Sequence, residues 1–287
     1  MATAPAVTPA SAKTATLREQ LRRPSVGDYL ASLGALALVL GANRHPARNT
    51  IKLLEGDQQY SVISPFPGGG FSVLPNGDLR PGGAMQVNIP VAYAPASFQG
   101  VANVYVAQSR QGRDPFKSSE INRNGTATLG LGDSLFGRPV WVAGMFLSET
   151  SFTSGGDLAY CAMVQLAPET RSVPAIAFGA QDFSNQRIRS PFVVATKQLP
   201  TSQPVYVTFG LGKGRFSGSD FFTGVSYSPV RRLSLCAEYD GIQYNIGAGY
   251  ALTNRLSVLA SYDDLAAATS RPVPQGRRYQ LGANYTF

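Results

Sequence analysis

The chain has 287 residues with a formal net charge of +8, only 15% of them are charged, and its mean hydropathy is −0.05. Soluble domains contain about 25% charged residues, and no run in this chain approaches the ~20 apolar residues of a membrane-spanning helix. The composition therefore argues against an ordinary soluble domain and a helical membrane protein. It suits a membrane β-barrel, in which each strand is half apolar and half small or polar.

The basic residues are scattered along the chain and do not cluster on a helix or interleave with a stacking motif. We therefore expect no nucleic-acid partner, and the positive charge predicts affinity for lipopolysaccharide or other acidic polymers. The two cysteines, Cys161 and Cys236, form no CxxC motif and have no histidine nearby. No metal site and no cofactor is expected from them.

Residues 1–50 form a separate N-terminal segment in this interpretation. Residues 2–16 are rich in Ala, Thr and Pro and are predicted to be disordered. The apolar run from Tyr29 to Leu40 fits either a signal peptide or a short helix capped by Ser25, and both alternatives stay open. His45, the only histidine, follows this run and is interpreted as a linker residue. The remaining residues, 51–287, are predicted to form the barrel domain.

From residue 83 onwards, apolar residues alternate with small or polar ones, the period of a half-buried strand. The polar face is rich in Gly and Ser, which suits a lumen, and Tyr and Phe recur at the ends of the apolar face, which suits an aromatic girdle. No helical insert interrupts the strands, so closure is the simplest way to remove the sheet edges. We predict an all-β, antiparallel, up-and-down transmembrane barrel, with a β-sandwich as the alternative. The predicted strands lie near residues 83–93, 100–109, 125–131, 139–148, 157–167, 174–181, 191–198, 204–212, 221–228, 232–240, 244–251, 255–262 and 278–287.

Connections of alternating length give the orientation of these strands. Outer-membrane barrels have long external loops and short periplasmic turns, which places the C-terminus on the periplasmic side. The strand at 83–93 would then run towards the periplasm and need one strand before it, from 58–64 or 70–74. The prediction is about fourteen strands, with twelve as the alternative. Basic residues expected in external loops, where they would meet acidic polymer or lipopolysaccharide, are Arg113, Lys117, Arg123, Lys213 and Arg215.

The alternation also assigns an inward face. Residues predicted to line the lumen are Gln86, Asn88, Glu238, Asp240, Asn245, Gln280 and Asn284. Glu238 and Asp240 would lie about 7 Å apart on one face, which leaves a barrel hydrolase with a carboxylate pair as a minor alternative. Carboxylates that pair with Arg or Lys in the lumen are the favoured interpretation. Because His45 lies outside the strands, we expect no histidine-dependent catalysis and no enzyme.

The last predicted strand has an apolar face and ends on an aromatic residue. Tyr279, Leu281, Tyr285 and Phe287 share that face. This pattern resembles the signal that outer-membrane barrels present to the barrel-assembly machinery, so that machinery is an expected partner.

Several stretches resemble the YjbH-like outer-membrane family, which is linked to exopolysaccharide production and export. The similarity covers roughly residues 170–262, and its most specific part is the block Ala237–Gly241 (AEYDG). The other similar stretches are 174–183 (PAIAFGAQDF), 193–199 (VVATKQL), 206–216 (YVTFGLGKGRF), 224–229 (GVSYSP) and 244–250 (YNIGAGY). The resemblance implies a non-enzymatic protein of the bacterial outer membrane that acts in exopolysaccharide secretion or cell-surface assembly, with exopolysaccharide or envelope proteins as possible partners. A general diffusion porin and a structural barrel within a larger envelope complex remain the alternatives.

Overall fold

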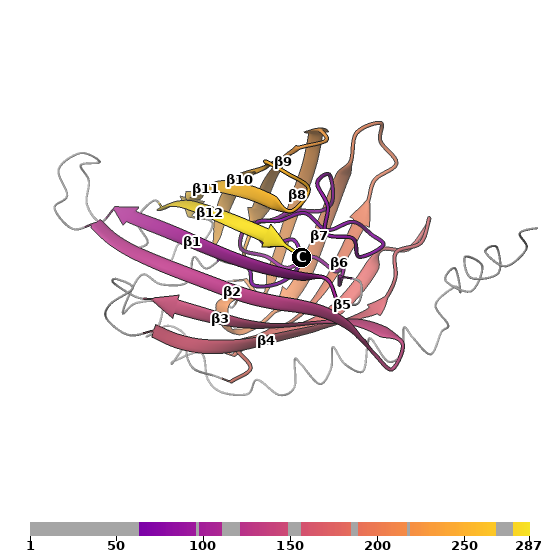
Figure 1. Ribbon diagram of the computed structural model, residues 1–287, viewed down its shortest axis with the longest axis horizontal. Helices are drawn as coiled ribbons and strands as arrows, with labels where there is room; N and C mark the ends of the chain where they lie inside the picture. Colours follow the sequence, from indigo (N-terminus) through magenta and orange to yellow (C-terminus); the bar gives the residue numbers. More distant parts are fainter. Residues whose placement is uncertain are drawn as a thin grey trace, which may run out of the picture.

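The computed structural model describes residues 63–95, 98–110, 121–148, 156–184, 189–216, 219–267 and 278–287. Twelve antiparallel strands form a closed barrel in which sequence neighbours pair and the last strand pairs with the first (Figure 1). This confirms the predicted all-β barrel, with the alternative count of twelve strands and not fourteen. The strands are β1 (Gly100–Arg110), β2 (Ile121–Leu135), β3 (Arg138–Ser148), β4 (Gly156–Ala167), β5 (Ala175–Gln181), β6 (Ser190–Gln198), β7 (Val205–Gly212), β8 (Phe221–Val230), β9 (Leu233–Tyr239), β10 (Gln243–Ala251), β11 (Leu256–Ala267) and β12 (Arg278–Thr286). Within the described ranges, no helix is long and apolar enough to cross a bilayer.

The barrel closes where β1 meets β12, in a continuous register from Val101↔Thr286 to Ser109↔Arg278. One residue beyond this ladder, Gly100 N donates to Phe287 O (2.9 Å) and Phe287 N donates to Gly100 O (3.0 Å). The Phe287 ring covers Gly100, because a Cβ at that glycine would lie 2.5 Å from the ring. Closure leaves no sheet edge with unpaired backbone groups.

The outward face of the barrel is apolar. Leu129, Leu281 and Phe209 are each at least half exposed although they are large hydrophobic residues. Aromatic residues gather near both ends of the strands: the rings of Tyr262 and Tyr279 lie 4.9 Å apart near one end, and those of Tyr285 and Phe287 stack at 6.5 Å at the other. A closed sheet with an apolar exterior between aromatic girdles is the structure of a barrel that spans a lipid bilayer.

The connections differ in length between the two ends of the barrel. Turns at one end comprise residues 136–137, 168–174, 199–204, 231–232 and 252–255, and connections at the other comprise residues 111–120, 149–155, 182–189, 213–220, 240–242 and 268–277. The rule of short periplasmic turns places the first set, together with the start of β1 and the end of β12, on the periplasmic side. This end is called the periplasmic mouth below.

Residues 63–95, here called the plug, lie inside the barrel (Figure 1, indigo to purple). The predicted strand at 83–93 is therefore wrong: Met85, Val87 and Ile89 are buried in the lumen and face no lipid. The plug forms only two isolated β-bridges, Gly69↔Gln86 and Val73↔Ala84. Residues 70–74, proposed as an extra strand, also belong to the plug, and residues 1–62 lie outside the described residues.

The plug cannot form a regular strand because of its glycines and prolines. Pro90 lacks the N–H that a central strand needs, and the plug contains five further prolines and six glycines. At Gly70 the backbone has φ +76°, and a Cβ there would lie 2.6 Å from the Tyr105 hydroxyl. The period-two pattern of 83–93 does not mark a lipid-facing side, because both its apolar and its polar residues are buried.

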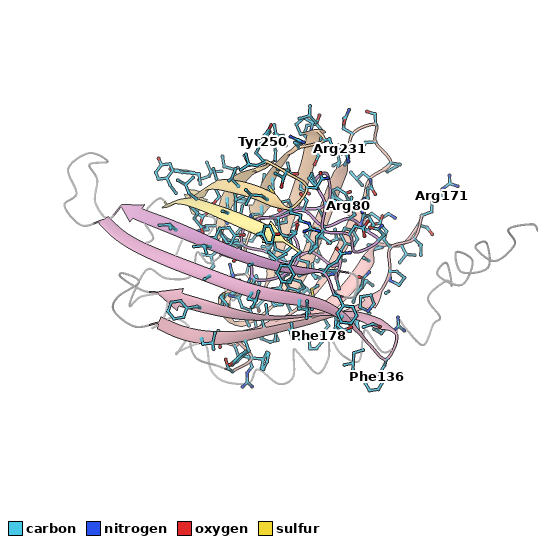
Figure 2. The ribbon with its side chains drawn as sticks, viewed as in Figure 1. Arg80, Phe136, Arg171, Phe178, Arg231 and Tyr250 are labelled. Atoms are coloured by element: carbon cyan, nitrogen blue, oxygen red, sulfur yellow. The ribbon has the colours of Figure 1, made fainter. Side chains whose placement is uncertain are left out.

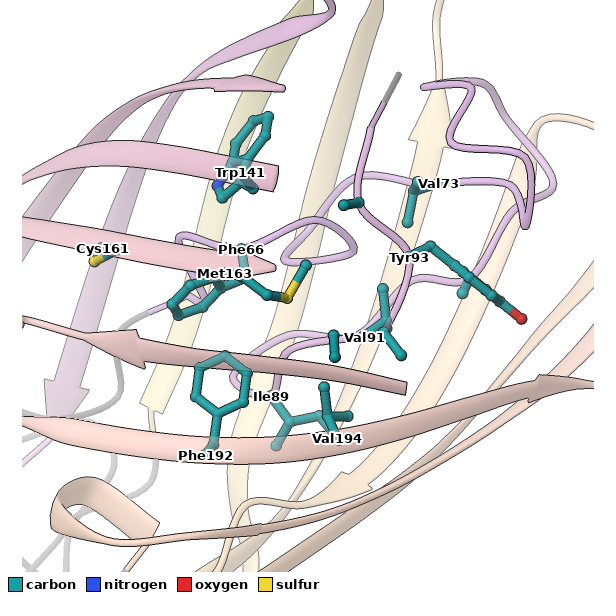
Figure 3. Close-up of a cluster of buried hydrophobic side chains, with 14 of the residues drawn as sticks. Phe66, Val73, Ile89, Val91, Tyr93, Trp141, Cys161, Met163, Phe192 and Val194 are labelled. Atoms are coloured by element: carbon teal, nitrogen blue, oxygen red, sulfur yellow. The ribbon is translucent and has the colours of Figure 1, made fainter. Parts of the chain in front are cut away.

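The apolar core lies between the plug and the wall formed by β3 to β8 (Figure 3). Phe66 of the plug packs edge-on against Phe192 of β6, with ring centroids 4.8 Å apart. Trp141 of β3, the only tryptophan, donates from Nε1 to Pro65 O (2.9 Å). The core of this protein therefore holds the plug to the wall, and its one tryptophan reports on that contact.

The space for Trp141 depends on a glycine of the neighbouring strand. A Cβ at Gly130 would lie 2.0 Å from Trp141 Cζ2, whereas a Cβ at Gly144 would have Leu158 Cδ1 at 3.8 Å as its nearest atom. We expect Gly130→Ala to displace the ring, at a cost of about 1–3 kcal/mol for overpacking, and Gly144→Ala to be tolerated. The measurement is the shift in gel mobility between unboiled and boiled protein, together with Trp141 emission. Equal behaviour of the two variants would contradict this packing.

Candidate functional site: the plugged lumen

Glu238 of β9 holds the middle of the plug. Its two carboxylate oxygens accept from the backbone amides of Val87 (2.9 Å) and Asn88 (2.7 Å). All three groups are buried. Hydrogen bonds from amides to a carboxylate are charge-assisted and stronger than those between neutral groups. Glu238 thus supplies acceptors that a neighbouring strand would supply in a sheet.

Other wall side chains do the same for amides on either side. Ser226 Oγ of β8 accepts from Met85 N (3.3 Å), Thr196 Oγ1 of β6 accepts from Ala92 N (2.9 Å) and Gln165 Oε1 of β4 accepts from Ala94 N (3.0 Å). Wall donors meet plug carbonyls in return: Tyr105 bonds to Gly69 O (3.0 Å), Asn284 to Gly70 O (2.9 Å) and Tyr206 to Gly82 O (3.1 Å). Side chains from around the whole barrel bind the plug backbone.

Predicted lumen residues come together beside Glu238. Asp240 accepts from Ile242 N and Gln243 N, both at 3.0 Å. Asn245 Nδ2 bridges the two carboxylates, at 3.1 Å from Asp240 Oδ2 and 3.3 Å from Glu238 Oε1. Gln280 of β12 donates to Asp263 of β11. The carboxylates of this network are structural acceptors, each with backbone or amide partners.

Arg215 lies in this lumen and not on the surface, contrary to the prediction. The connection between β7 and β8 folds inward as the short helix η1 (Gly214–Phe216), and Arg215 is 5% exposed. Its guanidinium donates to Gln181 Oε1 (2.9 Å), and its backbone N donates to Ser190 Oγ (3.0 Å). Burial lowers the pKa of Arg215, and the carboxylates of Asp240, Glu238 and Asp263 oppose that effect. The nearby carboxyl groups offset part of the cost of burying this arginine.

The other basic residues predicted in external loops have different positions. Lys213 forms an ion pair with Asp220 in the connection between β7 and β8. Arg123 lies within β2 and not in a loop, because that strand already begins at Ile121. Arg113 and Lys117 lie outside the described residues.

Gln86 and Asn88 lie in the lumen but belong to the plug, not to the wall as predicted. Their side-chain amides are fully buried and form no hydrogen bond with another described residue. On β12, Gln280 and Asn284 point inward, while Tyr279, Leu281 and Tyr285 point outward, and Phe287 directly after the strand is also exposed. The wall residues that the sequence interpretation missed, including Thr196 and Ser226, lie on the same small polar face that predicted the lumen.

The carboxylate pair of the hydrolase alternative, Glu238 and Asp240, is not free to act on a substrate. Glu238 and Asp240 are each at most 5% exposed, and their oxygens bind backbone amides and Asn245. General acid–base work requires a carboxyl group within reach of a substrate, and the plug occupies that space. His45 lies outside the described residues. The arrangement holds a polypeptide segment through side-chain hydrogen bonds.

No protein-family model and no curated protein matches the sequence. Among solved structures, the KdgM porin has 10% sequence identity and a TM-score of 0.43, covering 65% of this chain and 99% of its own. The NanC porin has 10% identity and a TM-score of 0.42, with coverages of 64% and 98%. The outer membrane phospholipase A from Escherichia coli has 9% identity and a TM-score of 0.43, with coverages of 67% and 93%.

The chain is a plugged β-barrel of the bacterial outer membrane. That statement depends on the closed antiparallel sheet, the even strand number and the apolar band between aromatic girdles. The wall corresponds to residues 100–286, and the plug precedes it in the sequence.

Two substitutions are expected to change plug docking in opposite directions. Glu238→Ala leaves the amides of Val87 and Asn88 without acceptors, at about 1–3 kcal/mol for each buried donor. Asn88→Leu replaces a buried amide that has no hydrogen-bond partner among the described residues with an apolar side chain of similar size, so we expect tighter docking by about 1 kcal/mol. The rate of proteolysis within 63–95 of the detergent-solubilised protein measures both effects.

The wall provides an internal control for that experiment, since its ladder hydrogen bonds are the same in both variants. The gel mobility of each unboiled variant should therefore equal that of the unboiled unmodified protein. Slower cleavage in Glu238→Ala than in the unmodified protein would show that Glu238 does not hold the plug.

Proposed function

We propose that this protein acts, without catalysing a reaction, in exopolysaccharide secretion or cell-surface assembly, and that its plug closes the passage until it is displaced. The observation that carries this proposal is that polar wall side chains hold the plug by its backbone. A plug held by a β-ladder would be part of the sheet. A plug held by side chains leaves a complete barrel when it moves.

The groups exposed by displacement suit a sugar chain. Gln165, Thr196, Ser226, Glu238 and Asn284 now bond to plug amides or carbonyls. Carbohydrate hydroxyl groups both donate and accept, so they can take the place of the plug backbone at each of these residues. Exchange of one set of partners for another costs little, because no buried group is left unpaired.

The resemblance to the YjbH-like family supports the same proposal. Its stretches fall on β5 to β10, and they contain Glu238, Arg215 and Asn245. The similar part of the chain therefore includes residues that organise the lumen, and not only residues that face lipid.

Two alternatives remain within the same fold. A general diffusion porin would conduct ions steadily through a lumen that stays open. A structural barrel would keep its plug docked and act through envelope protein partners. The buried plug favours either a gated passage or the structural role over an open porin.

We also propose two sets of contacts for the outward surface. The apolar exterior contacts outer-membrane lipid and lipopolysaccharide. The row formed by Tyr279, Leu281, Tyr285 and Phe287 serves as the signal for the barrel-assembly machinery. Both proposals rest on the outward, exposed placement of these side chains at the seam of the barrel.

The native Cys236 allows the plug to be locked. A Cβ at Gly247 would lie 2.5 Å from Val87 Cγ2 and 2.9 Å from Cys236 Sγ, so these two side chains are neighbours. We expect Val87→Cys to form a disulfide with Cys236 in the oxidising periplasm. Cells in which this variant replaces the unmodified protein should lose surface exopolysaccharide to the level of a deletion strain.

The matched control is Val87→Cys combined with Cys236→Ser, which has the same plug substitution but cannot form the bond. Exopolysaccharide should return to normal in that strain. If deletion of the protein leaves exopolysaccharide unchanged, the secretion role is wrong. If deletion abolishes it but the locked variant does not, the protein acts as a structural barrel with a fixed plug.

A further inference from the structure

A pocket lies at the periplasmic mouth, between the plug and the wall formed by β9 to β12. Arg80 lines it from the plug, and Arg232 and Arg255 line it from the turns before β9 and β11. Plug and wall are in contact here, since Ser72 Oγ of the plug lies 3.2 Å from Ser234 Oγ of β9. Three arginines therefore line one pocket from two separately held parts of the chain.

Little negative charge compensates these arginines. Arg80 has Asp78 at 3.7 Å, and within the described part of the chain no carboxylate lies within ion-pair distance of Arg232 or Arg255. The same end of the barrel carries Arg171 and Arg231 (Figure 2, right-hand side). Like charges brought together repel, and an anion placed between them relieves that repulsion.

The rest of the pocket suits a molecule rich in hydroxyl groups. Besides Ser72 of the plug and Ser234 of β9, the uncharged polar residues of the lining are Thr253, Asn254, Ser257 and Thr286. Leu79 and Pro81 add apolar surface of the kind that packs against the C–H face of a sugar ring. Phosphate and carboxylate are the groups that arginine binds best, through paired N–H donors.

We propose that this pocket binds an anionic sugar unit through its carboxylate or phosphate group. Among the described residues, the lumen beyond the pocket holds the carboxyl groups of Glu238, Asp240 and Asp263 and one buried arginine, Arg215. The docked plug fills that space and the carboxyl groups disfavour an anion, so the ligand stays at the mouth. There it contacts plug and wall together, and by linkage it stabilises the docked plug.

This inference deepens the proposed function, because the choice of a sugar rests on the exopolysaccharide role. The presence of an anion site does not rest on that role. Binding to the purified protein therefore tests the site separately from any change in cellular exopolysaccharide. By the same linkage, an acidic sugar bound at the mouth keeps the passage closed.

The experiment titrates the full-length purified protein in neutral detergent with glucuronate, glucose 6-phosphate and glucose. These probes share a ring and differ in charge. Trp141 emission reports plug docking, and isothermal titration reports binding. We expect saturable binding of both anionic sugars, no binding of glucose, and slower proteolysis of the plug in the bound state.

Arg232→Gln with Arg255→Gln should weaken binding about tenfold or more through loss of charge-assisted hydrogen bonds. Arg171→Gln, at the same end but outside the pocket, is the matched control.

A second arm adds phosphatidylglycerol to the micelles to separate a lipid phosphate from a sugar anion. Binding of the anionic sugars that phosphatidylglycerol does not displace supports a sugar ligand. If phosphatidylglycerol displaces the anionic sugars fully from the unmodified protein, and this effect is lost in the double variant, the sugar proposal is overturned and the site binds a lipid headgroup. Equal binding of glucose and glucuronate, unchanged binding in the double variant, or no binding of any probe would overturn the anion site itself.

Discussion

Every buried backbone N–H and C=O needs a hydrogen-bond partner, and the plug has almost no strand to provide them. Two isolated bridges and several turn and loop hydrogen bonds within the plug, such as Ser64 N to Val87 O, satisfy part of its backbone. Other buried groups of the plug find their partners on the wall. The wall meets that requirement with side chains: Glu238, Thr196 and Gln165 accept from plug amides, and Tyr206 and Asn284 donate to plug carbonyls. The identity of the inward polar residues follows from this constraint. A lumen built only for water would need polarity, but not acceptors placed opposite particular amides.

The same constraint separates the stability of the wall from that of the plug. Ladder hydrogen bonds between the strands involve no plug atom, so they persist whether the plug is docked or not. Docking depends on side-chain hydrogen bonds, on the contact of Phe66 with Phe192, and on the bond from Trp141 to Pro65. It also leaves the amides of Gln86 and Asn88 buried without described partners, which is unfavourable for the docked state. The plug is thus the part of this structure with the lower free energy of opening.

The sequence predicted all twelve wall strands, because each has one face in lipid and one in the lumen, which imposes a strict period of two. It failed at 83–93, where the same period of two occurs although both sides of the stretch are buried in the lumen. Pro90 in the middle of that stretch was the available signal against a strand. The inward placement of Glu238 and Asn245 followed from parity along their strands. The position of Arg215 did not follow from parity along a strand. Loop length does not tell whether a loop folds outward or into the lumen, and the carboxyl groups near Arg215 are distant from it in the sequence.

The charges of the described residues divide along the barrel axis, and the plug connects the two regions. Carboxylates gather in the lumen around Glu238, and arginines gather at the periplasmic mouth around Arg80. Arg80 and the amides of Val87 and Asn88 belong to one short stretch of backbone, so a displacement of one end moves the other. The mouth and the lumen are therefore coupled through covalent connection, and no chain of packed side chains is needed between them. A ligand that neutralises the arginines acts on the same segment that Glu238 holds, which places recognition and closure in one element.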